Sequence, residues 1–430
     1  MLPLILLIKS DFRVIMINKR YILFSLALIF ATVFSVAWSQ VDSALYVELT
    51  NTKPCVKVQE SKLITFEGTD STLSPFFKKL DDVLNNGRSE VNIWHVGGSH
   101  VQAGVFSHRV RNNIAKLING GQASRTIMFP YKLIGTNGPA DYKVSGTGTW
   151  TKSKCTERNP TYELGLSGIT AVTSSPDASV TFAMSTGGDV DWSASVIKVI
   201  GKASDPDVLP YIVVGNKSLK CRRCGDNDIY EFDVPDSTIA FTVMFHGLGI
   251  GKSFELRGVV AMNNRPGVNY WASGVNGAAT SSWLKCSLLE QDLKLIALDM
   301  VVFGIGINDA HTPNFKPEKF KANYQQIIDK IKRTNPLCHF VFVTNNDNLM
   351  KSGVNPNTER VEKVFMELAQ ENNGSVWNLY RLMGGFGGSK KWVGNSLMQK
   401  DHIHFTRAGY QLIGDMFYNA LVQEYLNWKY

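Results

Sequence analysis

Three polar residues supply the groups that nucleophilic catalysis by a serine requires. Ser99 follows the pair Gly97-Gly98 in the first quarter of the 430-residue chain, and Asp401 and His404 lie near its end. A serine hydroxyl attacks a carbonyl efficiently only when a base removes its proton and a carboxylate orients that base. We therefore expect Ser99 to be the nucleophile, His404 the base and Asp401 the residue that orients it.

Hydrogen-bond donors for a developing negative charge are the second requirement of such a reaction. Each preorganised donor typically contributes ~10²–10³ in rate. The candidates for this oxyanion hole are the backbone N–H groups of Ser99 and Gly277 and the side-chain amide of Asn308. Each candidate residue also fits a plainer role, because Asp and His cap helices or fill cores and Gly and Asn are common in turns.

Apolar runs and amphipathic segments alternate on both sides of a differently patterned middle section. The expected strands are 91–96, 268–275, 300–305, 338–343 and 375–379, and the expected helices are 106–117, 320–332, 358–370 and 407–425. This alternation is typical of a parallel sheet with helices on both faces, and ligands of such sheets bind beyond the carboxyl ends of the strands. Ser99, Gly277 and Asn308 each follow a strand. The Asp401–His404 loop follows the last strand, so all four segments are expected to converge on one edge.

The middle section, residues 145–263, alternates between apolar and polar side chains with period two and lacks helical periodicity. This pattern predicts an all-β sandwich or jelly roll, inserted between the first and second strands of the parallel sheet. Its aromatic residues Trp192, Tyr211 and Tyr230 could stack on sugars, although core packing is the commoner role. The predicted domains are a signal peptide (1–39), a lead-in segment (40–87), two parts of the α/β domain (88–144 and 264–430) and the β insertion (145–263).

The first 39 residues have the pattern of a secretory signal. Lys19-Arg20 precede an uncharged, mostly apolar stretch from Tyr21 to Val36, and Ala37-Trp38-Ser39 then offers small residues for cleavage. A membrane anchor is the alternative, but the stretch is short for a bilayer span. We expect export to the periplasm or cell envelope, with no integral membrane span in the mature chain.

Charge and composition narrow the class of protein. The apolar fraction of 44% and charged fraction of 19% are those of a globular protein. The formal net charge of +8 becomes +5 when residues 1–39 are removed, because Lys9, Arg13, Lys19 and Arg20 leave together with Asp11. This mild charge is spread along the chain, so no nucleic-acid partner is expected.

Among six cysteines, Cys221 and Cys224 form the one local pair. A zinc site would need a second pair or histidines at matching spacing, and none is present, so no metal is expected. The pair is therefore interpreted as a small loop disulfide or two free thiols.

Several further residues lie at or near the expected edge. Trp94 and His95 lie on the first strand and are expected to be core residues. His100 follows the candidate nucleophile, where it could line a pocket or pack at the start of a helix. The segments 344–348 and 384–388 lie near the same rim and are candidate substrate contacts.

The four segments resemble the sequence blocks of the SGNH (GDSL) hydrolase superfamily. They read Gly97-Gly-Ser-His100, Gly274-Val-Asn-Gly277, Gly306-Ile-Asn-Asp309 and Asp401-His-Ile-His404. The resemblance implies a flavodoxin-like three-layer sheet, Ser99, Asp401 and His404 as catalytic residues, Ser99, Gly277 and Asn308 as the oxyanion hole, and no metal or organic cofactor. The family usually has Asp before the nucleophile, where this chain has Gly98.

The likeness is narrower to bacterial exported peptidoglycan O-acetylesterases, which have a carbohydrate-binding-like β insertion. It rests on the long insertion, on the continuation Val101-Gln102 after the first block and on the closing segment 401–410. It implies an exported serine esterase that removes O-acetyl groups from a polysaccharide, with peptidoglycan as the expected polymer. The alternatives are an O-acetyltransferase with the same residues and a glycan-binding protein with a decayed site. The sequence does not indicate the oligomeric state.

Overall fold

A six-stranded sheet positions the expected edge. The computed structural model describes residues 45–118, 123–185 and 190–430, so the predicted signal peptide lies outside the described residues. The strand order is β1-β20-β17-β16-β2-β15, and β1 alone pairs antiparallel to its neighbour. The strands are β1 (Leu63–Ile64), β2 (Glu90–Gly97), β15 (Gly267–Gly274), β16 (Met300–Gly304), β17 (His339–Val343) and β20 (Ser375–Trp377).

The five parallel strands have the flavodoxin-like order. Numbered along the chain, they lie side by side as 2-1-3-4-5, which confirms the predicted fold class of this part. In β2 every residue after Glu90 is buried, because helices cover both faces of the sheet. The register places Trp271 of β15 beside Trp94 of β2, which in turn pairs with Val301 of β16.

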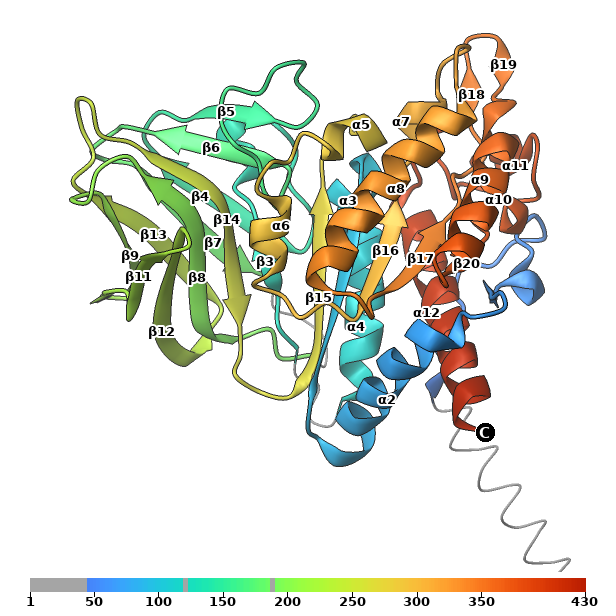
Figure 1. The fold of residues 1–430 in the computed structure, drawn as a ribbon, viewed down its shortest axis with the longest axis horizontal. Coiled ribbons are helices and arrows are strands. Elements are labelled where there is room, and N and C mark those ends of the chain that lie inside the picture. Colours follow the sequence, from blue (N-terminus) through green and yellow to red (C-terminus); the bar gives the residue numbers. More distant parts are fainter. Residues whose placement is uncertain (1–44, 119–122, 186–189) are drawn as a thin grey trace, which may run out of the picture. The chain divides into compact units, whose positions relative to one another are not determined.

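Helices cover both faces of this sheet (Figure 1). Those of the α/β part are α2 (Asp70–Asn86), α3 (Ser99–Gln102), α4 (Val105–Leu117), α5 (Thr280–Trp283), α6 (Leu289–Leu293), α7 (Ile307–Ala310), α8 (Pro317–Thr334), α9 (Asn357–Glu371), α10 (Leu379–Leu382), α11 (Gly388–Gly394) and α12 (Arg407–Lys429), with the 3₁₀ turn η1 (Val58–Glu60) and the hairpin β18 (Leu349–Met350) and β19 (Gly353–Val354). No helix among the described residues is long and apolar enough to cross a membrane.

The two faces of the sheet are filled by alternate residues of the same strands. On one face Phe303 and Phe342 stack at 5.3 Å and pack with Tyr324 of α8 and Phe365 of α9. On the opposite face His95 contacts Phe106 of α4, and Trp377 contacts Phe417 of α12. His95 and Trp94 are both completely buried, as the sequence predicts for core residues.

Two antiparallel sheets occupy the chain between α4 and β15, at the left of Figure 1. One has five strands in the order β10-β9-β13-β7-β4; the other has seven, in the order β11-β12-β8-β14-β6-β5, with β3 paired to β14. The strands are β3 (Thr126–Met128), β4 (Tyr142–Thr147), β5 (Thr151–Lys154), β6 (Ile169–Thr173), β7 (Ser179–Met184), β8 (Ala194–Ala203), β9 (Leu209–Val214), β10 (Lys217–Leu219), β11 (Arg223–Asp226), β12 (Ile229–Thr238), β13 (Ala240–His246) and β14 (Phe254–Met262), and a 3₁₀ turn, η2 (Tyr131–Ile134), lies between β3 and β4. Strand pairing therefore begins at Thr126, before residue 145.

The side chains between these two sheets form a shared apolar core. Phe182, Phe241 and Phe254 are among its buried members. Trp192 and Tyr230 are also buried, and the Tyr211 ring stacks on His246 at 4.2 Å, so all three aromatic residues have protein partners.

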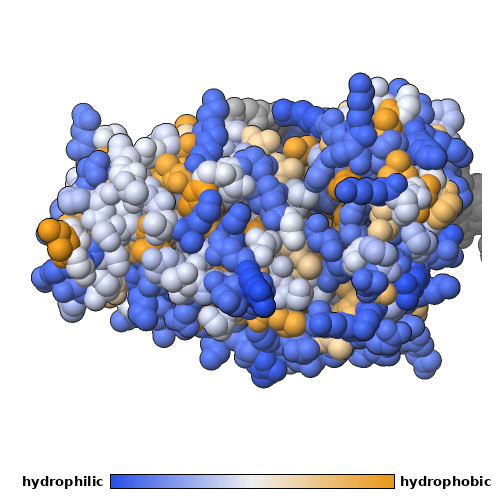
Figure 2. Space-filling model, turned by 90° about the horizontal axis from the view of Figure 1, so that it is seen from above, coloured by the Kyte–Doolittle hydropathy of each residue, from blue (hydrophilic) through white to orange (hydrophobic). Residues whose placement is uncertain are grey.

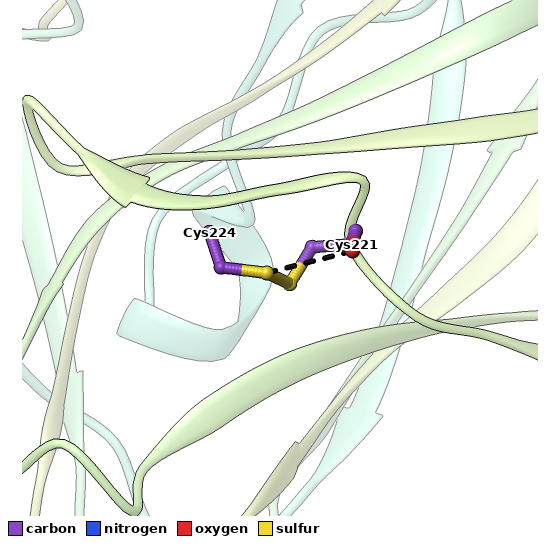
Figure 3. The surroundings of a disulfide bond; sticks show 2 residues. All are labelled: Cys221 and Cys224. Carbon is purple, nitrogen blue, oxygen red and sulfur yellow. Dashed lines mark hydrogen bonds between the residues drawn. A yellow bond between two sulfur atoms is a disulfide. The ribbon is translucent and has the colours of Figure 1, made fainter.

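The local cysteine pair is a disulfide in the structure. Cys221 and Cys224 are bonded at the edge of the seven-stranded sheet (Figure 3), where β11 pairs with β12. Of the two interpretations left open by the sequence, the structure selects the small loop disulfide.

A buried ionic cluster joins the antiparallel sheets to the α/β part. Asp141, just before β4, accepts hydrogen bonds or ion pairs from Arg111 of α4, from Arg125 and from His108. Arg111 also donates two hydrogen bonds to the carbonyl oxygen of Tyr270 in β15. Burial raises the pKa of Asp141, but Arg125, His108 and Arg111 together hold it well below its usual range.

We expect Asp141→Asn to destabilise the fold by about 3–5 kcal/mol at pH 7, because it leaves two buried guanidinium groups without their carboxylate. The folded-state pKa is depressed, so this stabilisation is fully present above the unfolded value near 3.9, shrinks progressively below that value and disappears only when the pH falls through the folded-state pKa. Urea denaturation at pH 7 and at about pH 3.5 measures the difference.

The matched control is Asp207→Asn, which removes an exposed carboxylate paired with Lys252 and should change stability by less than about 1 kcal/mol. Equal destabilisation by the two variants, or a loss at Asp141 that does not shrink in acid, would contradict the role assigned to this cluster.

Candidate active site

Ser99 begins helix α3 directly after strand β2. The turn is tight, since a Cβ on Gly97 would lie 2.8 Å from the carbonyl oxygen of Gly304 on the neighbouring strand. Glycine at 97 therefore permits the close approach of two backbones. The N–H group of Ser99 stands at the start of a helix, where N–H groups have no partner within the helix.

Ser99 lies in a chain of hydrogen bonds with His404 and Asp401. Ser99 Oγ donates to His404 Nε2 at 2.8 Å, and His404 Nδ1 donates to Asp401 Oδ2 at 2.7 Å. The second carboxylate oxygen, Oδ1, accepts the backbone N–H groups of Ile403 and His404 at 2.9 Å each. In this tautomer His404 presents a free lone pair to the serine, which is what a general base requires.

The charge of Asp401 is set by opposing effects. Burial raises its pKa, but hydrogen bonds from the His404 ring and from two backbone N–H groups outweigh it, and the net pKa is lowered. Asp401 therefore remains ionised at neutral pH, where it orients His404 and can stabilise a positive charge on the ring.

The loop that carries these two residues is held between α11 and α12. His402 has a φ of 57°, an uncommon conformation for a residue other than glycine. The N–H of Gln399 donates to the carbonyl oxygen of His404 at 2.7 Å, and Thr406 caps α12 by accepting from the N–H of Gly409. Asn346 Nδ2 also donates to the carbonyl oxygen of Ile403. Contacts on both sides therefore fix the position of His404.

The candidate oxyanion donors come from the two segments after β15 and β16. Gly277 has a φ of 81°, which favours glycine. Asn308, in the short helix α7, donates from Nδ2 to the carbonyl oxygen of Ala278 at 3.0 Å, which leaves its second amide hydrogen available. A Cβ on Gly98 would lie 3.3 Å from Asn308 Nδ2, so the amide lies beside the serine turn.

Asp309 joins the same two segments a second time. Its carboxylate accepts hydrogen bonds from both the N–H and the hydroxyl of Thr280. Burial raises the pKa of Asp309 to about 6, while the Thr280 hydrogen bonds act in the opposite direction.

The predicted site residues meet in one cleft of about 680 Å³. Its lining consists of Ser99, Ala103, Asn137, Asn276, Gly277, Ile307, Asn308, His311, Gln399, Ile403, His404, Phe405 and Tyr410. Asp401 lies behind His404. The parallel strands point upward in Figure 1, so Figure 2 is seen from the carboxyl edge, where hydrophilic residues predominate and apolar ones are scattered.

The sequence did not single out an amide network on one wall of this cleft. Gln102 is buried; its Oε1 accepts the N–H of Asn276 at 2.6 Å and its Nε2 donates to the carbonyl oxygen of Asn137 at 2.7 Å. Asn276 Nδ2 donates to Asn137 Oδ1 at 2.6 Å. Gln102 therefore holds the Val275–Asn276 peptide group, one peptide before the Gly277 N–H. Its place three residues after Ser99 was the one available signal.

His100 and the segment 344–348 lie behind the cleft. The His100 ring hydrogen-bonds the Tyr410 hydroxyl at 2.7 Å and lies 5.4 Å from the His404 ring. Burial, followed by the nearby His404, lowers the pKa of His100 to about 3, so it is neutral. Thr344 and Asn346 line a small cavity on this side, and neither 344–348 nor 384–388 supplies a residue to the cleft lining given above.

Residues 253–412 match the model of the GDSL-like lipase/acylhydrolase family. The match includes Gly277, Asn308, Asp401 and His404 but not Ser99, because the antiparallel sheets separate the first block from the others. Comparison with curated protein sequences finds no match.

Among solved structures, a peptidoglycan O-acetylesterase has a TM-score of 0.70 at 20% identity, covering 85% of this chain and 99% of that one. A lipase/acylhydrolase from Enterococcus faecalis (TM-score 0.30, 23% identity, 37% of this chain and 77% of that one) and Axe2, an acetylxylan esterase from Geobacillus stearothermophilus (0.29, 15%, 36% and 73%), are similar over smaller regions.

Residues 253–412 thus resemble a GDSL-like lipase/acylhydrolase domain, and the chain shares the fold of the solved peptidoglycan O-acetylesterase. Two additional antiparallel sheets lie in the chain between the first two strands of its parallel sheet.

We expect Gln102→Leu to lower kcat for ester hydrolysis by about 10- to 100-fold with a smaller change in KM, because the Asn276 peptide loses its acceptor and a misplaced oxyanion donor costs up to ~10²–10³. Steady-state kinetics on a chromogenic acetate ester measures both constants. Gln102→Glu keeps the acceptor for Asn276 and should recover part of kcat. Equal kinetics in Gln102→Leu and wild type would contradict this positioning role.

We expect Gly98→Ala to lower kcat about tenfold, because its methyl group would displace the Asn308 amide without removing it. Gly394→Ala is the control, since a Cβ there meets nothing within 4 Å. A wild-type kcat in Gly98→Ala would contradict the role of the Asn308 amide as an oxyanion donor.

Proposed function

We propose that this chain is an exported serine esterase that removes O-acetyl groups from a polysaccharide, with peptidoglycan as the polymer. The observation that carries the proposal is the hydrogen-bond chain from Ser99 Oγ through the His404 ring to Asp401, at 2.8 and 2.7 Å. In this series of hydrogen bonds His404 takes the proton of the Ser99 hydroxyl, so the serine becomes nucleophilic without a cofactor.

The reaction follows from these contacts. His404 Nε2 accepts the proton of Ser99 as Oγ attacks the acetyl carbonyl carbon, and Asp401 stabilises the imidazolium. The N–H groups of Ser99 and Gly277 and the Asn308 amide would bind the oxyanion. The carbon–oxygen bond to the sugar then breaks, and His404 returns the proton to the sugar oxygen. Water activated by His404 hydrolyses the acetyl-enzyme, which releases acetate and restores the Ser99 hydroxyl.

The cleft supports hydrolysis over acetyl transfer. The side chains of Asp401 and His404 are 46% and 39% exposed, so water has access to the base. A transferase would need to exclude water from the acetyl-enzyme. The amide groups of Asn137, Asn276 and Gln399 at the cleft suit the hydroxyl and amide groups of a sugar polymer.

Several further assignments belong to this proposal. Residues 1–39 would be the signal peptide that directs export to the periplasm or envelope. Residues 145–263 would be an inserted, carbohydrate-binding-like β module, with 40–87 as a lead-in and 88–144 and 264–430 as the hydrolase domain. The fold shared with a solved peptidoglycan O-acetylesterase supports the choice of polymer.

Acetate release from O-acetylated peptidoglycan, compared with acetylated xylan, tests the function. We expect release from peptidoglycan and a loss of about 10⁴-fold or more in kcat for Ser99→Ala, since the remaining oxyanion contacts act without a nucleophile. The exposed Ser352→Ala serves as the control with full activity.

The other possible results distinguish the alternative substrate and the alternative functions. Acetate release from xylan alone would support the esterase activity, with xylan in place of peptidoglycan as the polymer. If wild type and Ser99→Ala bound glycan equally and neither released acetate, the proposed enzymatic activity would be wrong and a glycan-binding function would be supported. Transfer of acetyl to an added sugar in preference to water would support the transferase.

A further inference from the structure

Two buried cysteines lie where the antiparallel sheets contact the α/β part. Cys155 directly follows strand β5, and Cys286 lies between helices α5 and α6. Both are completely buried in the same apolar cluster, and both are free thiols in the structure. Gly168 touches both segments, since a Cβ there would lie 3.3 Å from the Cys155 sulfur and 3.2 Å from the ring of Trp283, three residues before Cys286, although 130 residues separate the two cysteines in the chain.

The backbone on both sides of the contact is held in place. The N–H of Cys155 donates to the carbonyl oxygen of Gly168 at 2.9 Å, and that of Cys286 donates to Trp283 at 3.2 Å. A Cβ on Gly168 would lie 3.3 Å from the Cys155 sulfur, so the sulfur is closely packed. Lys285 Nζ also donates to the carbonyl oxygen of Glu157. The two segments therefore touch at positions that neighbour both cysteines.

The contact lies beside the oxyanion segment. Thr156, next to Cys155, supplies the atom nearest to the position of a Cβ on Gly277, at 4.0 Å. Cys286 lies nine residues after Gly277 on the segment that runs through α5. A bond between the sulfurs would therefore link the segment with Thr156, which lies beside Gly277, to the segment that runs from Gly277 to Cys286.

We propose that Cys155 and Cys286 form a disulfide in the mature protein, which fastens the antiparallel sheets to the oxyanion side of the cleft. Each thiol gives up a proton, a sulfur–sulfur bond forms, and two electrons pass to a protein or small-molecule disulfide, which becomes two thiols. The proposal uses the export part of the proposed function, because such bonds persist in oxidising compartments.

This exchange takes place during folding. Contact with Cys155 and burial both raise the pKa of the Cys286 thiol, so little thiolate exists in the folded state. An oxidant also cannot reach a fully buried sulfur. The bond should therefore form while the chain closes around this contact, and it should resist reduction until the protein unfolds.

Peptide mapping tests the pairing directly. The full chain without residues 1–39 is refolded with reduced and oxidised glutathione, unfolded without reductant, alkylated, digested and analysed by mass spectrometry. We expect one peptide pair linked through Cys155 and Cys286, the Cys221–Cys224 bond, and alkylated Cys55 and Cys338. Alkylation of both Cys155 and Cys286 would overturn the proposal, whether or not the protein has esterase activity.

Thermal unfolding in the variant Cys221→Ala/Cys224→Ala provides the second measurement. This variant retains Cys155 and Cys286, so we expect Tm to fall by about 5 °C when reductant is present during refolding, since a bond that closes a loop of more than about 100 residues stabilises strongly. The matched variant Cys155→Ala/Cys286→Ala should show at most a small shift, from the short Cys221–Cys224 loop. Equal Tm values with and without reductant in the first variant would contradict the bond.

Discussion

The rest of the structure holds Ser99 and His404 within hydrogen-bonding distance of each other. This hydrogen bond joins residues 305 positions apart, so no local preference of the chain can form it. One partner is placed by the end of an interior strand, the other by a loop anchored at the start of the last helix. The close approach of Gly97 to Gly304 on one side, and the cap of Thr406 on the other, reduce the freedom of both partners. A misplacement of either by about 1 Å would remove the geometry that proton transfer needs.

The candidate oxyanion donors are held by cross-links of a different kind. The Asn308 amide and the Asp309 carboxylate connect the segment after β16 to the segment after β15, and Gln102 connects that segment to the serine helix. Each of these groups is hydrogen-bonded to the backbone, so the donors are held before substrate arrives. Preorganisation of this kind is the main source of electrostatic stabilisation in such sites.

The antiparallel sheets are part of this architecture. They attach through the Asp141 cluster at one point and through the packing of the segments around Cys155 and Cys286 at another. The second contact brings Thr156 next to Gly277, and Asn137 reaches the cleft from the turn between β3 and β4. The chain between α4 and β15 therefore contributes to the wall of the cleft, which a parallel sheet with short connections would leave open.

The sequence by itself determined the parallel sheet, its alternation with helices and the place where the candidate site residues meet. Apolar periodicity and the rule that polar residues after parallel strands share an edge were sufficient to bring Ser99, Gly277, Asn308 and His404 together, because both depend on local pattern. The hydrogen bonds between segments that are distant in the chain were decided only by the tertiary structure. The amides of Gln102, Asn137 and Asn346 stand in segments without periodicity, and their partners are distant in the chain. Their roles become visible only when folding has placed a donor beside an acceptor, since a hydrogen bond depends on distance in space and leaves no spacing in the sequence.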